Sequence, residues 1–399
     1  MTRLRVLFFA EAVTLAHAAR PVVLAKSLDP ARYDVHLAWA PRYQALFGPL
    51  PGTVHAIRSL PTATFVRRLA RGQPLYDLAT LRAYVAEERA LIERLNPDVV
   101  VGDFRLSLAV SAPLTGKPYC ALINAYWSPY ARQRYTVPET PLNRWLGIGA
   151  SQALFDRLRP ALFALHTVPL NRLRRRFGLP GFGGDLLKLY THADRTLYTD
   201  LPELVPTYDR PAHHRYLGPL LWSPETPLPG WWDALPDDRP LVYLTLGSSG
   251  EARLLPAIVA ALATLPVTVL AATAGAALPS PPPANLYAAE FLPGLAAARR
   301  AALVICNGGS PTTQQALAAG APVLGIARNL DQYLNMDYLQ RAGVGLTLRS
   351  DALNPKALTA AVRHLLDEPA YRARARALGD AIAAYPSGRV FEDLLAEYA

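Results

Sequence analysis

Residues 303–320, LVICNGGSPTTQQALAAG, contain the pattern of a strand, a turn and a helix, and they decide the fold class of this chain. An apolar run ends at Cys306, and the glycine-rich segment 307–309 follows it. Ser310 suits the N-cap of a helix and Pro311 its first position, and a glycine closes the pattern. The stretch therefore predicts a tight loop between the carboxyl end of a strand and the N-terminus of a helix.

Short apolar runs alternate with helical patterns on both sides of this stretch. The predicted strands are residues 4–10, 35–39, 99–101 and 119–123, then 241–246, 268–272, 286–288, 303–306 and 322–326. The predicted helices are residues 21–28, 76–95, 254–263, 311–319, 336–342, 355–367 and 389–398. Short apolar strands that alternate with helices are typical of parallel sheets covered on both faces, so we predict an α/β fold.

The length of 399 residues suits two domains, each with its own core. Residues 218–240 contain six prolines, which favours an interdomain linker. We therefore expect an N-terminal domain at 1–217 and a C-terminal domain at 241–380. A helix within residues 381–399 is expected to return to the N-terminal domain.

Composition limits the class of protein. Hydrophobic residues make up 51% and charged residues 18%, which is globular and excludes a disordered chain. Cys120 and Cys306 both lie in predicted strands, which favours buried free thiols over a disulfide or a structural zinc site. There is no signal-peptide pattern and no apolar run near the ~18 residues of a membrane span, so we expect a cytoplasmic protein.

The net charge of +10 favours anionic partners. The most basic part of the chain is residues 131–176. That segment holds nine arginines against Glu139 and Asp156, with leucines and aromatic residues between them. It is either a solvated helical face or an amphipathic surface for peripheral contact with a membrane or an anionic acceptor. No nucleic-acid-binding signature accompanies the charge, so we expect no nucleic-acid partner.

The glycine loop has two interpretations. Main-chain amides and the dipole of the following helix make an anion site suited to a diphosphate; alternatively, the glycines only form a tight turn. It is neither a Walker loop nor a dinucleotide fingerprint. Asp331 and Gln332 follow the predicted strand 322–326, where they either bind the vicinal hydroxyls of a sugar or form a solvated pair.

On these residues, the segment 291–345 resembles the donor-binding signature of the GT1 family of UDP- and dTDP-sugar glycosyltransferases. The matching positions are Phe291-Leu292-Pro293-Gly294, Asn307-Gly308-Gly309, Thr312-Thr313, Gln315, Gly320-Ala321-Pro322 and Asp331-Gln332, and residues 241–249 are similar to the family's strand that ends in Gly-Ser. The resemblance implies a GT-B fold, in which two Rossmann-like domains with parallel sheets face each other across a cleft. It also implies a nucleotide-diphosphate sugar donor, inverting transfer, and neither metal nor cofactor.

By this resemblance, Phe291 stacks on the base and Leu292 pairs with it through its backbone. The diphosphate, ribose and sugar positions fall on Ser248, Asn307, Gly308, Gly309, Ser310, Thr312, Thr313, Gln315, Asp331 and Gln332. Three positions depart from the family pattern. Asn307 replaces a histidine and Gln315 a glutamate, so both charges are lost, and Gly294 stands where glutamine is common.

The resemblance also predicts the catalytic pair. His17 lies in a predicted loop at 11–20, before Leu24-Ala25-Lys26, and matches the family's general base. Neutral imidazole suits proton removal near pH 7; the alternative is a solvated histidine. Asp103 follows a strand and matches the residue that orients the base, or else it caps a turn. Glu11 is a weaker candidate for the partner of His17 or for the base itself.

The acceptor is the least defined part. Glu11, Tyr126, Trp127 and Tyr130 are the candidate contacts, and their aromatic character favours an apolar or aromatic natural product or a lipid. Two other functions stay open: a nucleotide-sugar 2-epimerase on the same fold, and a non-catalytic nucleotide-sugar-binding helper protein.

Overall fold

The computed structural model describes residues 3–247 and 250–399, which fold into two compact units. Unit 1 consists of Met1–Gln133, Leu142–Leu220 and Pro386–Ala399. Unit 2 consists of Arg134–Pro141 and Leu221–Tyr385. The chain passes from unit 1 to the body of unit 2 at Leu221, inside the proline-rich segment.

Unit 1 is built on a parallel sheet with the strand order β3-β2-β1-β4-β5-β6-β7. The strands are β1 (Leu4–Ala10), β2 (Tyr33–Trp39), β3 (Thr53–Ala56), β4 (Val99–Asp103), β5 (Tyr119–Ile123), β6 (Arg195–Tyr198) and β7 (His214–Tyr216). The order reverses between β1 and β4, so the loops that follow these two strands run in opposite directions. In such sheets, ligands bind at the carboxyl ends of the strands beside this reversal.

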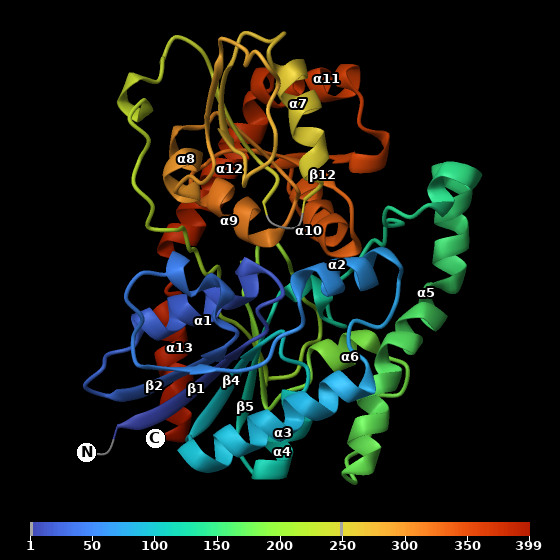
Figure 1. Ribbon diagram of the computed structural model, residues 1–399, viewed down its shortest axis with the longest axis vertical. Coiled ribbons are helices and arrows are strands. Elements are labelled where there is room, and N and C mark those ends of the chain that lie inside the picture. The colour runs from blue at the N-terminus through green and yellow to red at the C-terminus, as the bar shows by residue number, and fades with distance from the viewer. Residues whose placement is uncertain (1–2, 248–249) are drawn as a thin grey trace. The chain divides into compact units, whose positions relative to one another are not determined.

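Helices cover both faces of this sheet, with α1 on one side of the strands and α3 and α4 on the other (Figure 1). The helices are α1 (Leu15–Ser27), α2 (Thr62–Ala70), α3 (Leu78–Leu95), α4 (Leu108–Thr115), α5 (Leu142–Arg176), α6 (Leu186–Tyr190) and α13 (Ser387–Leu395), with short 3-10 turns at Pro41–Leu46 and Ala125–Trp127. Capping sets the ends of α3: the Asp77 carboxylate accepts from Thr80 N at 2.7 Å, and Asn96 ends the helix with a φ of 45°.

The C-terminal segment belongs to unit 1. Helix α13 packs against α1, and the buried ring of Phe391 lies 5.9 Å from that of Phe8 (Figure 1). Beyond the helix, Glu397 forms ion pairs with Arg195 at 2.8 Å and with Arg215 at 2.6 Å. Buried aromatic surface therefore anchors the segment, and the exposed ion pairs fix its register.

Unit 2 is built on a second parallel sheet, with the order β10-β9-β8-β11-β12-β13. The strands are β8 (Leu241–Thr245), β9 (Thr268–Ala272), β10 (Leu286–Ala289), β11 (Leu303–Cys306), β12 (Val323–Ala327) and β13 (Gly345–Arg349). The helices are α7 (Leu255–Leu262), α8 (Gly294–Arg300), α9 (Ser310–Ala318), α10 (Leu330–Arg341), α11 (Pro355–Asp367) and α12 (Pro369–Ala384). The order reverses between β8 and β11, which places the glycine loop after β11 at the reversal.

The prediction of an α/β fold with parallel sheets is confirmed, and both cysteines are buried free thiols as expected. Four strands were missed: β3, β6, β7 and β13. Their sequences mix polar and apolar residues (TVHA, RTLY, HRY and GLTLR), so they lack the continuous apolar run by which the other strands are recognised.

Two helix starts were predicted too late. Helix α1 begins at Leu15 although Pro21 suggested a start there, because a buried helix face outweighs the hydrogen bond that an internal proline removes. Helix α10 begins at Leu330, and Asn329 caps the N-terminus of the helix. The correction matters for the site: His17, Asp331 and Gln332 lie in first helical turns, not in loops.

A short segment inside the range 1–217 lies in unit 2. Residues Arg134–Pro141 are held there because Glu139 N donates to the carbonyl of Arg328 at 2.8 Å and Arg349 Nη1 donates to the carbonyl of Val137 at 2.8 Å. The Glu139 carboxylate also pairs with Arg328 at 3.0 Å. These links are long in sequence, so no local pattern predicts them.

Candidate active site

One candidate site lies at the carboxyl edge of the unit 1 sheet. Asp103 ends β4 and is completely buried, and Oδ1 of Asp103 lies 2.8 Å from Nδ1 of His17 in the first turn of α1. Main-chain pairing fixes this geometry, because Glu11 N donates to the carbonyl of Asp103 at 3.0 Å as the chain leaves β1. The structure thus brings the two predicted catalytic residues together.

Arg20, one turn further along α1, was not predicted as a site residue. Its Nε lies 2.7 Å from Oδ2 of Asp103, and its Nη2 donates to Oδ1 at 2.8 Å. Nη2 also lies 3.0 Å from Nδ1 of His17. On its other edge, Nη1 donates to Asn124 Oδ1 at 3.0 Å and to Thr199 Oγ1 at 2.9 Å. A buried guanidinium therefore connects the ends of β4, β5 and β6.

This arrangement can move a proton. A neutral His17 that donates Nδ1–H to Asp103 keeps Nε2 as its proton acceptor, and the carboxylate stabilises the imidazolium that forms. Arg20 holds the carboxylate in place through both of its oxygens. His17 remains 19% exposed, whereas Asp103 is fully buried, so the histidine alone of this pair can reach a substrate.

Phe104 supports the histidine from one side. The two rings stack with centroids 4.6 Å apart and planes within 9°. Phe104 has a φ of 52°, a left-handed conformation that costs free energy for an aromatic residue. Strain of this kind concentrates at functional sites, where the surrounding packing enforces it.

Glu11 does not fit its expected role at the acceptor. It is fully buried, and its carboxylate accepts hydrogen bonds from Arg105 Nη1 at 2.9 Å and from the hydroxyl of Ser59. Burial raises the pKa of Glu11, and Arg105 opposes that rise. Arg105 also pairs with the buried Glu88 at 2.6 Å. Glu11 therefore exposes no atom to an acceptor and instead belongs to a buried ion-pair network under the loop.

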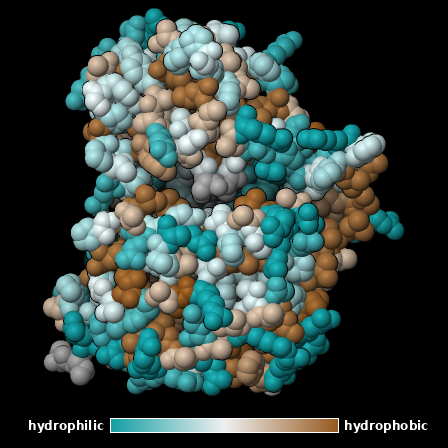
Figure 2. All heavy atoms as spheres, in the orientation of Figure 1, coloured by the Kyte–Doolittle hydropathy of each residue, from teal (hydrophilic) through white to brown (hydrophobic). Residues whose placement is uncertain are grey.

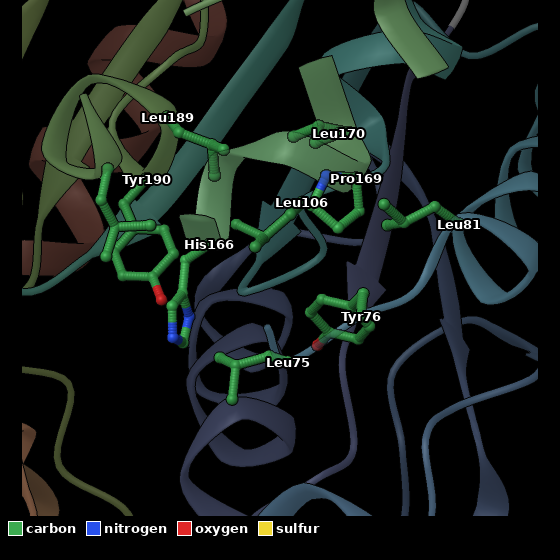
Figure 3. A pocket seen from close by; sticks show the side chains of 10 residues that line it. Leu75, Tyr76, Leu81, Leu106, His166, Pro169, Leu170, Leu189 and Tyr190 are labelled. Atoms are coloured by element: carbon green, nitrogen blue, oxygen red, sulfur yellow. The ribbon is translucent and has the colours of Figure 1, made fainter. Parts of the chain in front are cut away.

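A small apolar hollow lies beside Phe104. Its free volume is about 20 Å³, and it is lined by Leu75, Tyr76, Leu81, Leu106, His166, Pro169, Leu170, Leu186, Leu189 and Tyr190 (Figure 3). The rings of Tyr190 and Tyr76 lie 5.8 and 6.5 Å from that of Phe104. Aromatic contacts thus run from the hollow through Phe104 to His17.

The predicted acceptor aromatics separate in the structure. Trp127 packs edge-on against Tyr190 at 5.2 Å, so it contacts the wall of the hollow. Tyr126 is 1% exposed and buried in unit 1. Tyr130 packs on His214 at 5.2 Å instead. Of the three, Trp127 is the one that the structure brings to this region.

A second candidate site lies in unit 2, at the glycine loop. Gly308 has a φ of 80°, and a Cβ there would lie 2.7 Å from Cγ of Met336, so only glycine fits. Asn335 braces the loop from behind, because its Nδ2 donates to the carbonyl of Gly308 at 2.8 Å and to Thr313 Oγ1 at 2.9 Å.

The N-cap of α9 is Gly309, not Ser310 as predicted, and the Asn307 side chain accepts from Gly309 N at 2.9 Å. Asn307 therefore folds onto its own loop in an Asx turn. Ser310 becomes the first helical residue, and Thr312 in the same turn is partly exposed while Thr313 is buried. The first turn of a helix has amides without intrahelical acceptors, which is what an anion site needs.

Gln315 and Gly294, two of the departures from the family pattern, occupy the same space. Nε2 of Gln315 donates to the carbonyl of Trp222, and a Cβ at Gly294 would lie 2.5 Å from Oε1 of Gln315. A side chain at position 294 would require this amide to move. The glycine therefore leaves the space in which the Gln315 amide packs.

At the start of α10, Gln332 and Asn329 form a capping box. Gln332 N donates to Asn329 Oδ1 at 3.0 Å, and Gln332 Oε1 accepts from Asn329 N at 3.3 Å and from Arg328 N at 2.8 Å. This leaves the buried Nε2 of Gln332 without a hydrogen-bond partner among the described residues. Asp331 stands beside it in the same turn and is partly exposed.

The remaining donor predictions fall on residues of different exposure. Phe291 is half exposed, which leaves its ring face accessible to a base. The side chain of Leu292 is buried, so only its backbone is available, as its predicted role requires. Ser248 lies outside the described residues.

Within residues 3–247 and 250–399, no group of three or more His, Cys, Asp or Glu side chains could hold a metal ion. Nor does any helix there combine the length and apolar character needed to cross a membrane.

Several known proteins are similar to this chain. The family model "Erythromycin biosynthesis protein CIII-like, C-terminal domain" matches residues 252–396. The PGL/p-HBAD biosynthesis glycosyltransferase of Mycobacterium tuberculosis (strain ATCC 25177 / H37Ra) is 53% identical over 379 residues, covering 95% of this chain and 89% of that protein. The PGL/p-HBAD biosynthesis rhamnosyltransferase of Mycobacterium bovis (strain BCG / Pasteur 1173P2) is 52% identical over 379 residues, covering 95% and 84%.

Solved structures agree on the fold. The calicheamicin glycosyltransferase CalG4 superimposes with a TM-score of 0.73 at 20% identity, covering 100% of this chain and 98% of its own. The spinosyn rhamnosyltransferase SpnG complexed with thymidine diphosphate gives 0.68 at 20% identity, covering 98% and 100%. The two parallel α/β units and these superpositions show the GT-B fold. By its similarity over nearly its whole length to the mycobacterial enzymes, the chain belongs to the GT1 family of glycosyltransferases.

Proposed function

We propose that this glycosyltransferase moves a sugar from a UDP- or dTDP-sugar to a hydroxyl of an apolar or lipid acceptor, in one inverting step without a metal ion. The observation that carries the proposal is the pair of His17 and Asp103, 2.8 Å apart, with Arg20 holding the carboxylate. This pairing leaves Nε2 of an exposed histidine as a base, which is the group that transfer to a hydroxyl requires.

In the proposed step, Nε2 of His17 takes the proton of the acceptor hydroxyl as the acceptor oxygen bonds to the anomeric carbon. The bond from that carbon to the diphosphate oxygen breaks, and the nucleoside diphosphate leaves with the electron pair. The transfer is a single displacement. It therefore inverts the anomeric configuration and needs no covalent sugar-enzyme intermediate. The first-turn amides of α9 and the helix dipole stabilise the leaving phosphate.

The donor residues are proposed as follows. Phe291 stacks on the base, the loop of Gly308 and Gly309 approaches the diphosphate, and Asp331 binds sugar hydroxyls. The orphaned Nε2 of Gln332 is a suitable further donor to a sugar oxygen. Asn307, Ser310, Thr312, Thr313, Gln315, Leu292 and Ser248 complete the proposed donor site.

Two relatives favour a dTDP-sugar within this proposal. SpnG is a rhamnosyltransferase complexed with thymidine diphosphate, and the M. bovis relative is a rhamnosyltransferase. The M. tuberculosis and M. bovis relatives support a role for this chain in PGL/p-HBAD biosynthesis. A cytoplasmic location, the absence of a nucleic-acid partner, and membrane contact through residues 131–176 belong to the same proposal.

The acceptor is proposed to enter the aromatic hollow beside Phe104. Its lining of leucine, proline and tyrosine suits an apolar body with a hydroxyl, and Trp127 adds to the wall. Because the free volume is only about 20 Å³, lining side chains would have to move to admit the acceptor. His166 does not add charge there, because burial lowers its pKa below the ordinary value.

A thermal-shift screen of UDP, dTDP and their sugars tests donor binding, since a ligand of the folded state raises the melting temperature. Release of nucleoside diphosphate from the best donor is then compared in wild type, His17→Ala and a control, His364→Ala, at an exposed histidine of α11. We expect a loss of at least 100-fold in His17→Ala alone. Donor binding with no release in any variant would favour the helper protein, and a donor of changed sugar configuration would favour the epimerase.

A further inference from the structure

Helix α5 (Leu142–Arg176) exposes far more apolar surface than its neighbours. Gly147, with φ 73° and ψ 162°, breaks the helix near its start. Before the break, Trp145 is 85% exposed between the exposed Leu142 and Leu146. Figure 2 shows hydrophobic residues gathered along the edge of the molecule where Figure 1 draws α5.

After the break, the exposed leucines form a stripe. Leu154, Leu158, Leu162 and Leu165 are 36–48% exposed, and their spacing of four, four and three residues places them within an arc of about 80°. The opposite face is buried in unit 1 through Thr167, Leu170 and Leu173 and is already used for folding. The leucine stripe is therefore a second apolar face that folding of this unit leaves in water.

Arginines continue and flank this stripe. The helix contains seven arginines and one acidic residue, Asp156. Arg172 and Arg176 lie on the same arc as the leucines, and both are exposed. Arg174 differs, because it is buried and its Nε donates to the carbonyl of Pro180 at 2.6 Å. The solvent face of α5 is thus apolar at its centre and cationic at its C-terminal end.

We propose that this face of α5, the leucine stripe with Trp145 and the exposed arginines, docks on the surface of a bilayer that contains anionic phospholipid. An amphipathic helix with leucine and tryptophan on one face and arginine beside it inserts into the headgroup region, where guanidinium groups bind lipid phosphates. Charge argues against a second copy of the chain, which carries +10 and would bring its own arginines to the contact.

Docking would also place the acceptor hollow near lipid. His166, Pro169 and Leu170 line the hollow from the inner side of α5, while Leu162 and Leu165 lie on its outer side. The helix is then a wall between the bilayer and the hollow, and the acceptor is a membrane lipid that enters past it. The docking deepens the membrane contact of residues 131–176 given under the proposed function and does not depend on the chemical step, whereas this last step rests on the proposed acceptor.

The experiment is sedimentation with vesicles of phosphatidylglycerol and phosphatidylcholine (1:1), and with phosphatidylcholine alone. We expect binding to the anionic vesicles, at least tenfold weaker binding to neutral ones, and release at high salt. The pairs Leu158→Ser/Leu162→Ser and Arg172→Glu/Arg176→Glu should each weaken binding at least tenfold. The matched control Leu228→Ser/Arg363→Glu changes an exposed leucine and an exposed arginine elsewhere and should bind as wild type.

A second measurement does not depend on these variants folding. Brominated lipid should quench tryptophan emission in wild type, and Trp145→Phe should remove most of that quenching. The proposal fails if anionic vesicles do not bind, if neutral vesicles bind equally, or if the α5 pairs bind as wild type. It also fails if α5 mediates a concentration-dependent dimer instead. Release of nucleoside diphosphate should be unchanged in the α5 pairs, so failure of docking and failure of catalysis are distinguishable.

Discussion

Arg20 offers the sharpest test of the site in unit 1. Replacing it with methionine keeps the length of the side chain but removes the guanidinium that lies 2.7 Å from one oxygen of Asp103 and 2.8 Å from the other. Asp103 is completely buried, so the variant leaves a buried carboxylate with one partner, His17. Breaking a buried ion pair in this way costs about 3–5 kcal/mol of stability.

The same change should alter how His17 works. A unit charge about 4 Å away contributes about 4 kcal/mol at an effective dielectric of 20, and the 19% exposure of His17 lets solvent remove part of it. Without Arg20, the carboxylate is no longer neutralised and it stabilises the imidazolium more strongly. We therefore expect the pH–rate profile of the folded variant to differ from that of wild type.

The assay is nucleoside diphosphate release between pH 5 and 9, together with urea unfolding, for wild type, Arg20→Met and Arg20→Lys. Lysine keeps the charge but not the fork geometry, so it should restore most of the profile and only part of the stability. Arg67→Met, at an exposed arginine of α2, is the control. An unchanged pH profile in a folded Arg20→Met enzyme would refute the assigned positioning role.

Three further changes test other parts of the molecule. Gly308→Ala should lower stability by about 1–2 kcal/mol and weaken diphosphate binding in calorimetry, because the new Cβ meets Met336 in a left-handed backbone. Gln315→Glu should lower stability in urea by about 1–3 kcal/mol and fail to improve donor affinity, since it removes the hydrogen bond to the Trp222 carbonyl; tighter donor binding would contradict this. Burial lowers the pKa of His192 and of His214 to about 4, so the unfolded chain takes up protons first as pH falls. The stability contributed by these two histidines should therefore be complete above pH 6.5 and decline towards pH 4. Melting temperatures measured over this pH range should decline less in the variant His192→Gln/His214→Gln than in wild type.

The sequence predicts the framework of the protein well, because its signals are local. Apolar runs such as β1 are recognisable without any tertiary information. The same holds for β11 and the glycine loop and helix that follow it. Short strands at the sheet edges carry no such signal. The placement of residues 134–141 with unit 2 depends on contacts to Arg328 and Arg349, which are about 200 residues away.

The site shows the same division. His17 and Asp103 were identified from their motif, whereas Arg20 was hidden by the interpretation of Pro21 as a helix start. Had the helix been extended back to Leu15, the spacing of three residues would have placed Arg20 on the same face as His17. The network of Glu11, Glu88 and Arg105 could not be predicted, because composition does not tell which charged residues are buried together.

The departures from the family pattern take on a different meaning once the packing is known. From the sequence, Gln315 stands where the family pattern has a glutamate and lacks its charge, which suggests a weakened donor site. In the structure, its amide fills the space above Gly294 and binds the carbonyl of Trp222, so three positions distant in sequence depend on one another. A lost site would be expected to leave such an amide without a partner, whereas here it is packed and hydrogen-bonded. The packing therefore favours an altered donor preference over a lost activity.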